Sequence, residues 1–139
     1  MSNRIFIDSD IVLDLLCKRE GHYQYAAELF TLADKKEIAL VASPVVFANV
    51  FYILRKIVNN DKAKEYLRKL RLIVGVVTIT EKEIDLSLNS IFTDFEDGLQ
   101  YFCSRENCIE ILLTRNTKDY KEKGIVIQTP EQYLKSREK

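Results

Sequence analysis

Short apolar runs alternate with longer helical patterns along the whole chain. The apolar runs predict five strands, at residues 4–8, 38–42, 75–79, 110–114 and 125–127. Two of them, Ile5-Phe6-Ile7 and Ile111-Leu112-Leu113, are continuously apolar rather than alternating in polarity. Continuous runs are typical of parallel strands that are buried on both faces of the sheet.

The segments between the strands carry the spacing and capping signals of helices. Ser43-Pro44 is an N-cap followed by proline at the first helical position, and Thr80 with Glu83 forms a capping box for a helix that ends near Phe92. The other predicted helices cover residues 10–17, 22–36, 62–72 and 94–106 and start at Pro130, and the Pro44 helix runs to about Val58. This alternation predicts an α/β fold, a three-layer α/β/α sandwich around a central parallel sheet, in a single domain over residues 1–139.

Composition narrows the classes of function. The 21 basic and 21 acidic residues cancel, so any attraction to nucleic acid must come from a local patch. The chain has one histidine, His22, which argues against a zinc site and against histidine-based acyl transfer. Three cysteines without metal-ligand spacing indicate a reduced, cytoplasmic protein. The apolar stretches are too short to cross a bilayer, and no signal peptide is expected.

Three aspartates stand where predicted strands or loops meet helices. Asp8 follows the first strand, Asp97 stands at the opening of the 94–106 helix, and Asp119 follows the fourth strand. Carboxylates that lie close together at the edge of an apolar sheet repel one another, and a divalent cation is their commonest use. Open parallel sheets bind ligands at the carboxyl ends of their strands, where these residues are expected.

The segments around these aspartates resemble the motifs of one nuclease family. Ile7-Asp8-Ser9-Asp10 resembles the opening motif of PIN-domain nucleases, Asp97-Gly98-Leu99-Gln100-Tyr101 resembles their aspartate-led helix, and Thr114-Arg115-Asn116-Thr117-Lys118-Asp119-Tyr120 is similar to their fourth motif. The chain length resembles that of VapC-like toxins of toxin–antitoxin pairs. The resemblance implies an endoribonuclease that uses Mg²⁺ or Mn²⁺ on Asp8, Asp97 and Asp119, a cognate antitoxin partner and a homodimer.

The chain departs from the family at one position. The family normally has a glutamate in the helix after the second strand, and alignment of Ser43-Pro44 places Asn49 there. An amide oxygen can bind a metal but brings no charge. Asp94, one turn before Asp97, can replace the missing charge or cap its helix.

Each candidate also has a purely structural interpretation. Asp8 can serve as a helix N-cap, Asp97 can interact with the helix dipole, and Asp119 can stabilise a turn. The remaining polar residues of the motifs are candidates for positioning water or metal, or for turns and caps: Ser9, Asp10, Thr114 and Asn116. Asp14 is predicted either to form a salt bridge or to support the ligands of the site from behind.

Residues 55–71 hold seven basic residues and two acidic ones. Lys64, Arg68 and Arg71 follow helical spacing and predict either a solvated face or a track for an RNA phosphate backbone.

Two other classes of function remain open from the sequence. One is a catalytically weak PIN-like protein that binds RNA or a partner, for which Asn49 is the main support. The other is a receiver-like domain with a phosphate-accepting aspartate, although the third predicted strand ends at Thr78-Ile79-Thr80, without an acceptor.

Overall fold

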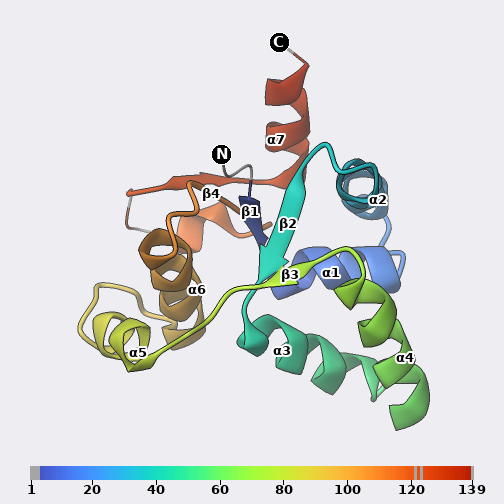
Figure 1. The fold of residues 1–139 in the computed structure, drawn as a ribbon, viewed down its shortest axis with the longest axis horizontal. Helices are drawn as coiled ribbons and strands as arrows, with labels where there is room; N and C mark the ends of the chain where they lie inside the picture. The colour runs from blue at the N-terminus through green and yellow to red at the C-terminus, as the bar shows by residue number, and fades with distance from the viewer. Residues whose placement is uncertain (1–3, 121, 123, 139) are drawn as a thin grey trace.

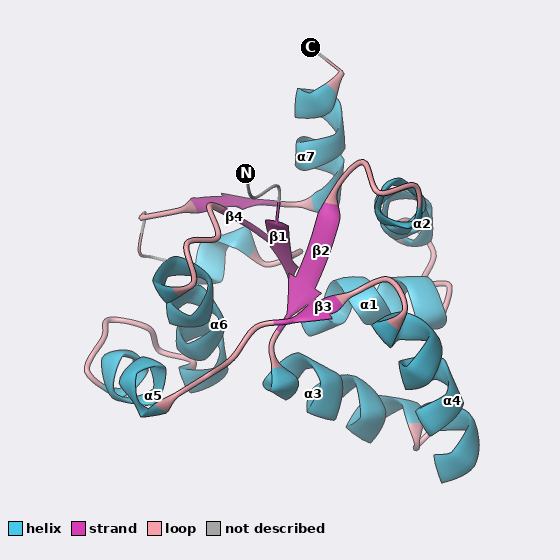
Figure 2. Cartoon of the chain, in the orientation of Figure 1, coloured by secondary structure: helices cyan, strands magenta, loops and turns pink. Residues whose placement is uncertain are grey.

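The five strands form one parallel sheet with the order β3-β2-β1-β4-β5. The computed structural model describes residues 4–120, 122 and 124–138. Its strands are β1 (Arg4–Ile7), β2 (Ala39–Ala42), β3 (Gly75–Val76), β4 (Ile111–Leu113) and β5 (Val126–Gln128). All five predicted strands are therefore confirmed, with β3 shorter than expected (Figure 2).

Helices lie on both sides of this sheet, as expected for the α/β sandwich. Figure 1 shows α1, α2 and α4 to the right of the sheet, α3 below it, and α5 and α6 to its left. The helices are α1 (Ser9–Leu16), α2 (Tyr23–Asp34), α3 (Pro44–Leu54), α4 (Asn60–Arg71), α5 (Glu81–Leu88), α6 (Phe95–Glu106) and α7 (Pro130–Arg137). A short 3₁₀ helix, η1 (Thr117–Asp119), follows β4.

The sheet register places the first aspartate beside the loop after β4. Ile7 pairs with Leu113 at the ends of β1 and β4, and the Asp8 backbone N–H donates to the Leu113 carbonyl oxygen at 3.0 Å. The next residue of each strand, Asp8 or Thr114, therefore lies at the same edge of the sheet. Because both strands are fully buried at these ends, this edge is held rigidly by the core.

The observed helix starts agree with the predicted ones better than the observed helix ends do. The capping box of Thr80 and Glu83 is present, and Pro44 occupies the first turn of α3. In contrast, α3 ends at Leu54 rather than at Val58, and Ile57, which lies beyond this end, is 64% exposed. Neither a glycine nor a proline marks this end of α3, and the apolar spacing of the sequence continues past it. The pattern therefore predicted a longer helix than the structure shows.

The strand order excludes the receiver-like alternative. Receiver domains have the order 2-1-3-4-5, whereas β1 here lies between β2 and β4. Cys17, Cys103 and Cys108 form no disulfide. Within the described ranges, every helix is too short or too polar to cross a membrane.

Candidate metal centre

Asp8 caps a helix and also faces the other acids. It is 9% exposed at the junction of β1 and α1, where its Oδ1 accepts a hydrogen bond from the Ser9 backbone N–H at 2.7 Å. Its Oδ2 accepts from the Thr114 hydroxyl at 2.9 Å. Burial raises the pKa of Asp8, and these hydrogen bonds oppose that rise. The capping interpretation is therefore correct, and the cap places a carboxylate at the carboxyl end of β1.

The start of α6 brings a second group of acids to the same place. Asp94 is the N-cap, and its Oδ1 accepts from the Asp97 backbone N–H at 3.0 Å, so Asp97 lies inside the first turn rather than opening the helix. Burial raises the pKa of Asp97 to about 7, together with the negative charges of Asp94, Asp8, Asp119 and then Glu96. Acids from separate parts of the chain thus act on one another at this edge of the sheet.

The loop after β4 contributes a polar shell and the third predicted aspartate. Thr114 is buried and holds Asp8, while Asn116 precedes η1 and its backbone N–H donates to the Thr114 hydroxyl at 3.2 Å. Asp119 ends η1 and is exposed. Ser9 is buried as the first residue of α1, and its hydroxyl has no hydrogen-bond partner among the described residues.

Glu96 is a member of this group that the sequence analysis missed. It is the second residue of α6 and accepts a hydrogen bond from the side-chain amide of Asn49, in α3. Burial raises the pKa of Glu96, and the charges of Asp8 and Asp94 raise it further, while the Asn49 hydrogen bond lowers it. Its position directly before Asp97 was a signal that could have identified it.

An arginine balances the acids behind Asp8. The Arg115 Nε lies 3.1 Å from Asp14 Oδ2 and 4.0 Å from Asp10 Oδ2, and Arg19 lies 3.6 Å from Asp14 Oδ1. The predicted salt bridge of Asp14 is therefore confirmed, with Arg115 as a partner that the sequence did not indicate. Burial and the charge of Asp8 raise the pKa of Asp10 to about 7, and Arg115 opposes that rise.

The donor set suits Mg²⁺ or Mn²⁺, which prefer carboxylate oxygens. Across the described parts of the chain, no three Asp, Glu, His or Cys side chains lie close enough together to hold one metal ion. Because like charges repel, carboxylates with no cation between them are most stable when they stand apart. Tyr120 is 5% exposed, and its hydroxyl has no hydrogen-bond partner within the described residues. Burial raises the pKa of Tyr120, and acids that include Asp8 and Asp97 raise it further. The carboxylates are the type of donor that a hydrated divalent cation uses, although the described side chains do not gather into a site for one.

The predicted basic row lies on α4, which packs against α3. Lys64 and Arg68 are exposed, whereas Arg71 donates a hydrogen bond from Nη1 to the Val74 carbonyl oxygen at 3.0 Å. All three residues are exposed, and Arg71 also helps to hold the end of its own helix.

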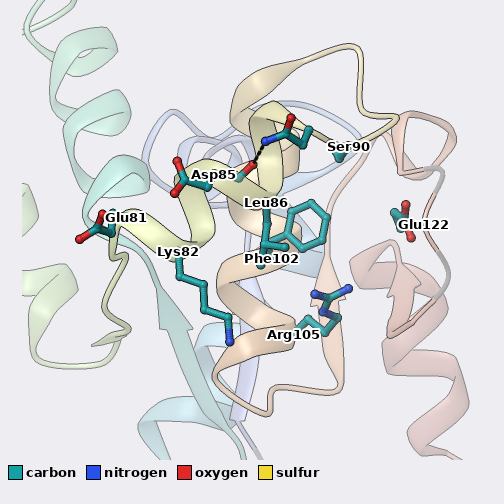
Figure 3. A pocket seen from close by; sticks show the side chains of 9 residues that line it. Glu81, Lys82, Asp85, Leu86, Ser90, Phe102, Arg105 and Glu122 are labelled. Atoms are coloured by element: carbon teal, nitrogen blue, oxygen red, sulfur yellow. Dashed lines mark hydrogen bonds between the residues drawn. The ribbon is translucent and has the colours of Figure 1, made fainter.

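A separate cavity of about 630 Å³ lies between α5 and α6 (Figure 3). Lys82, Leu86, Phe102 and Arg105 line it, together with acidic residues such as Glu122. The Arg105 guanidinium stacks 4.8 Å from the Phe102 ring centroid and bonds to the neighbouring glutamate of α6. As far as the described lining shows, none of the acids at the sheet edge belongs to this cavity, so it is distinct from the candidate metal centre.

Solved structures of similar fold come from toxin–antitoxin systems. The VapBC2 complex of Rickettsia felis, bound to a promoter DNA fragment, is 18% identical with a TM-score of 0.65, covering 91% of this chain and 98% of that chain. A toxin–antitoxin complex from Klebsiella pneumoniae is 20% identical with a TM-score of 0.67, covering 91% and 97%. Mycobacterium tuberculosis VapC20, a sarcin–ricin loop cleaving toxin, is 16% identical with a TM-score of 0.61, covering 78% and 86%. At these identities the likeness establishes the fold.

The family itself follows from the sequence match. No curated protein matches the chain. The family model of the PIN domain matches residues 4–118, which include Asp8, Asn49, Asp94 and Asp97. The chain therefore belongs to the PIN domain family.

Proposed function

We propose that this protein is a divalent-cation-dependent endoribonuclease and the toxin component of a toxin–antitoxin pair. The observation that carries the proposal is that the charges of Asp8 and Asp119, from two other segments of this PIN-domain chain, both raise the pKa of Asp97. We further propose that residues 1–139 act as one PIN domain in the cytoplasm.

The chain's own residues divide the work of phosphodiester hydrolysis. Asp8, Asp97 and Asp119 hold the cation, with Asp94 and Asn49 beside them as auxiliary groups. When bound, the cation stabilises negative charge on a phosphoryl oxygen and lowers the pKa of the attacking water. Thr114 fixes the Asp8 carboxylate through its 2.9 Å hydrogen bond, so that the carboxylate is oriented before RNA binds.

We propose that RNA reaches the carboxyl ends of the strands along α4. Lys64 and Arg68 are exposed on a helix that packs against α3, and their charges suit successive phosphates of a single strand. The cognate antitoxin and a second copy of the chain are proposed partners, supported by relatives that crystallised as toxin–antitoxin complexes.

Cleavage of total RNA tests the proposal directly. Wild type is expected to cut RNA with Mn²⁺ or Mg²⁺ and to stop when EDTA is added. Asp8→Asn is expected to abolish cleavage, whereas Asp61→Asn, which also removes an acid from the start of a helix, is expected to retain it. Cleavage that persists in EDTA or in Asp8→Asn refutes the proposal.

A second candidate function is RNA binding without efficient cleavage. It is favoured by Asn49, a neutral side chain at the position where the family resemblance places an acid. RNA that binds with high affinity but stays intact in Mn²⁺ favours this candidate over the nuclease.

A further inference from the structure

An exposed aromatic ring lies on α3, outside the packing of the core. The buried side of this helix is formed by Val46, Val50 and Leu54. Tyr52 lies off this stripe and is 57% exposed, and Ala48, one turn earlier, is exposed as well. The packing of α3 on the sheet therefore does not use the Tyr52 ring, which is open to contact with another molecule.

Positive charge lies directly beside this ring. The Arg55 guanidinium carbon is 4.3 Å from the centroid of the Tyr52 ring, the geometry of a cation–π contact. The helical turn extends to Arg55, whose backbone N–H donates to the Phe51 carbonyl oxygen at 3.0 Å, and Lys56 follows as another exposed cation. The sequence of α3 contains no acid. The ring thus stands in a locally basic part of the surface.

The helix that presents the ring joins the carboxyl ends of the strands to the basic helix α4. It begins after Ser43, which follows the end of β2, and β2 pairs in parallel with β1. At 1.5 Å per residue, Tyr52 lies about 12 Å along α3 from its first residue. Further on, α4 packs against α3 (Figure 1). An RNA strand between α4 and the ends of the strands therefore runs along the helix that carries Tyr52.

An aromatic ring beside cations suits both parts of a nucleotide. A base can stack on the ring, while the phosphate is attracted by the guanidinium and by the neighbouring lysine. In a duplex the faces of the bases are already covered by their neighbours, so only an unpaired base can use such a ring. The charge of this surface and its aromatic ring together favour single-stranded nucleic acid as the occupant.

We propose that Tyr52 is a stacking platform for an unpaired RNA base and gives the protein a preference for single-stranded RNA. The inference rests on the proposed function, because RNA is the substrate proposed there. Lys64 and Arg68 bind phosphates, which every RNA strand has, whereas Tyr52 distinguishes unpaired from paired RNA. Tyr52 is therefore a specificity-determining residue, and Arg55 orients its ring.

Fluorescence anisotropy with a labelled oligouridylate tests the proposal on the full chain, in EDTA to prevent cleavage. Tyr52→Ala is expected to bind the oligouridylate about 5- to 150-fold more weakly than wild type. Tyr52→Phe is expected to bind like wild type, because stacking requires the ring and not the hydroxyl. Neither substitution is expected to change the affinity for the same oligouridylate paired with oligoadenylate. Melting temperatures should stay near that of wild type, because the side chain is exposed.

Tyr23→Ala is the matched control. Tyr23 is a half-exposed tyrosine at the start of α2, which packs against α1 and α7 rather than along α3 and α4. Its removal is expected to leave the affinity for both probes unchanged. A second readout uses the absence of tryptophan from the chain. In Tyr52→Trp the single indole is expected to be quenched by the oligouridylate, whereas in Tyr23→Trp it is not.

The outcomes also separate this inference from the proposed function. Wild type that cleaves RNA, with a Tyr52→Ala variant that binds oligouridylate as tightly as wild type, overturns the role of Tyr52 and leaves the nuclease proposal standing. Equal losses for single-stranded and paired probes, or a loss in Tyr52→Phe as large as in Tyr52→Ala, also overturn stacking. Self-association that Tyr52→Ala abolishes, with unchanged RNA affinity, assigns the ring to a second copy of the chain instead. Wild type that binds neither probe overturns both proposals.

Discussion

Replacement of Asp97 by asparagine is expected to stabilise the metal-free protein, although it removes a proposed ligand. Asp97 lies in the first turn of α6, and its pKa is raised from 3.8 to about 7 by burial and by neighbouring acids. A rise of this size corresponds to about 4 kcal/mol of unfavourable free energy for the ionised form. Because the side chain is only half-buried, solvent screening reduces this to about 1–2 kcal/mol.

The stability that Asp97→Asn adds to the metal-free protein is expected to increase with pH. The pKa of Asp97 is higher in the folded protein than in the unfolded chain, so the folded state binds more protons between these two values. Its contribution to stability is therefore lost as pH rises from about 4 to about 7. The Asp97→Asn variant has a neutral amide at this position and carries no such penalty, so its advantage over wild type is greatest near pH 8 and small near pH 4.

Urea or thermal unfolding in EDTA measures the effect. The substitution also removes a favourable helix-dipole interaction of about 0.3–1 kcal/mol, which leaves a net gain near 1 kcal/mol, or about 2–5 °C in melting temperature. Asp61→Asn, in the first turn of α4, loses the same dipole interaction with no gain to offset it. A variant that is destabilised near pH 8, or stabilised equally at both pH values, refutes the repulsion between the acids.

Three further changes test the site and its support. Mn²⁺ at about one hundred times its dissociation constant is expected to stabilise wild type by about 2.7 kcal/mol, and to have little effect on the melting temperature of Asp8→Asn. Lys64→Glu with Arg68→Glu is expected to weaken RNA binding and flatten its salt dependence in a filter-binding titration, without changing Mn²⁺ affinity. Gly98→Ala is expected to cost about 1–3 kcal/mol in urea unfolding despite the better helix propensity of alanine. The reason is that its Cβ would lie 2.2 Å from the Ser87 hydroxyl, and Ser87→Ala should recover part of the loss.

Controls make these outcomes specific. Lys35→Glu with Lys36→Glu reverses two exposed charges just before β2, at the opposite end of the strands, and should leave RNA affinity unchanged. Equal weakening by both pairs would assign the effect to net charge rather than to α4. A Gly98→Ala protein as stable as wild type would mean that α5 can move away from α6 at little cost.

Local sequence patterns were sufficient for the strands and for most helix starts. The continuous apolar runs at Ile5–Ile7 and Ile111–Leu113 are typical of buried strands, and Thr80 could satisfy orphan backbone donors of α5. Helix ends were less certain, because the chain after Leu54 has apolar spacing but no stop signal. The order of strands depends on which connections cross the sheet, and this information is not local.

The residues of the candidate site also divide into those that local motifs could predict and those that depend on contacts between distant segments. Asp8, Asp97 and Asp119 stand in short motifs at element boundaries, and the three motifs in this order can be recognised from the sequence. The contacts of Asn49 with Glu96 and of Asp14 with Arg115 join distant parts of the chain. Such pairs form only when the sheet has brought their helices and loops together, so the sequence could identify Asn49 and Asp14 but not their partners Glu96 and Arg115.

The first turn of α6 carries more negative charge than a helix start requires. One acid at the cap satisfies a backbone donor, and a further acid gains about 0.3–1 kcal/mol from the helix dipole. Here Asp94 caps the helix, yet Glu96 and Asp97 follow directly, and both have pKa values raised by burial and by neighbouring acids. The cost of keeping these carboxylates ionised beside other acids exceeds what they gain from the helix dipole. Stability of the helix start therefore does not explain why this turn carries so many acids. Charge that opposes stability at the edge of the sheet where β1 also delivers Asp8 is the pattern expected when a positively charged ligand completes the site.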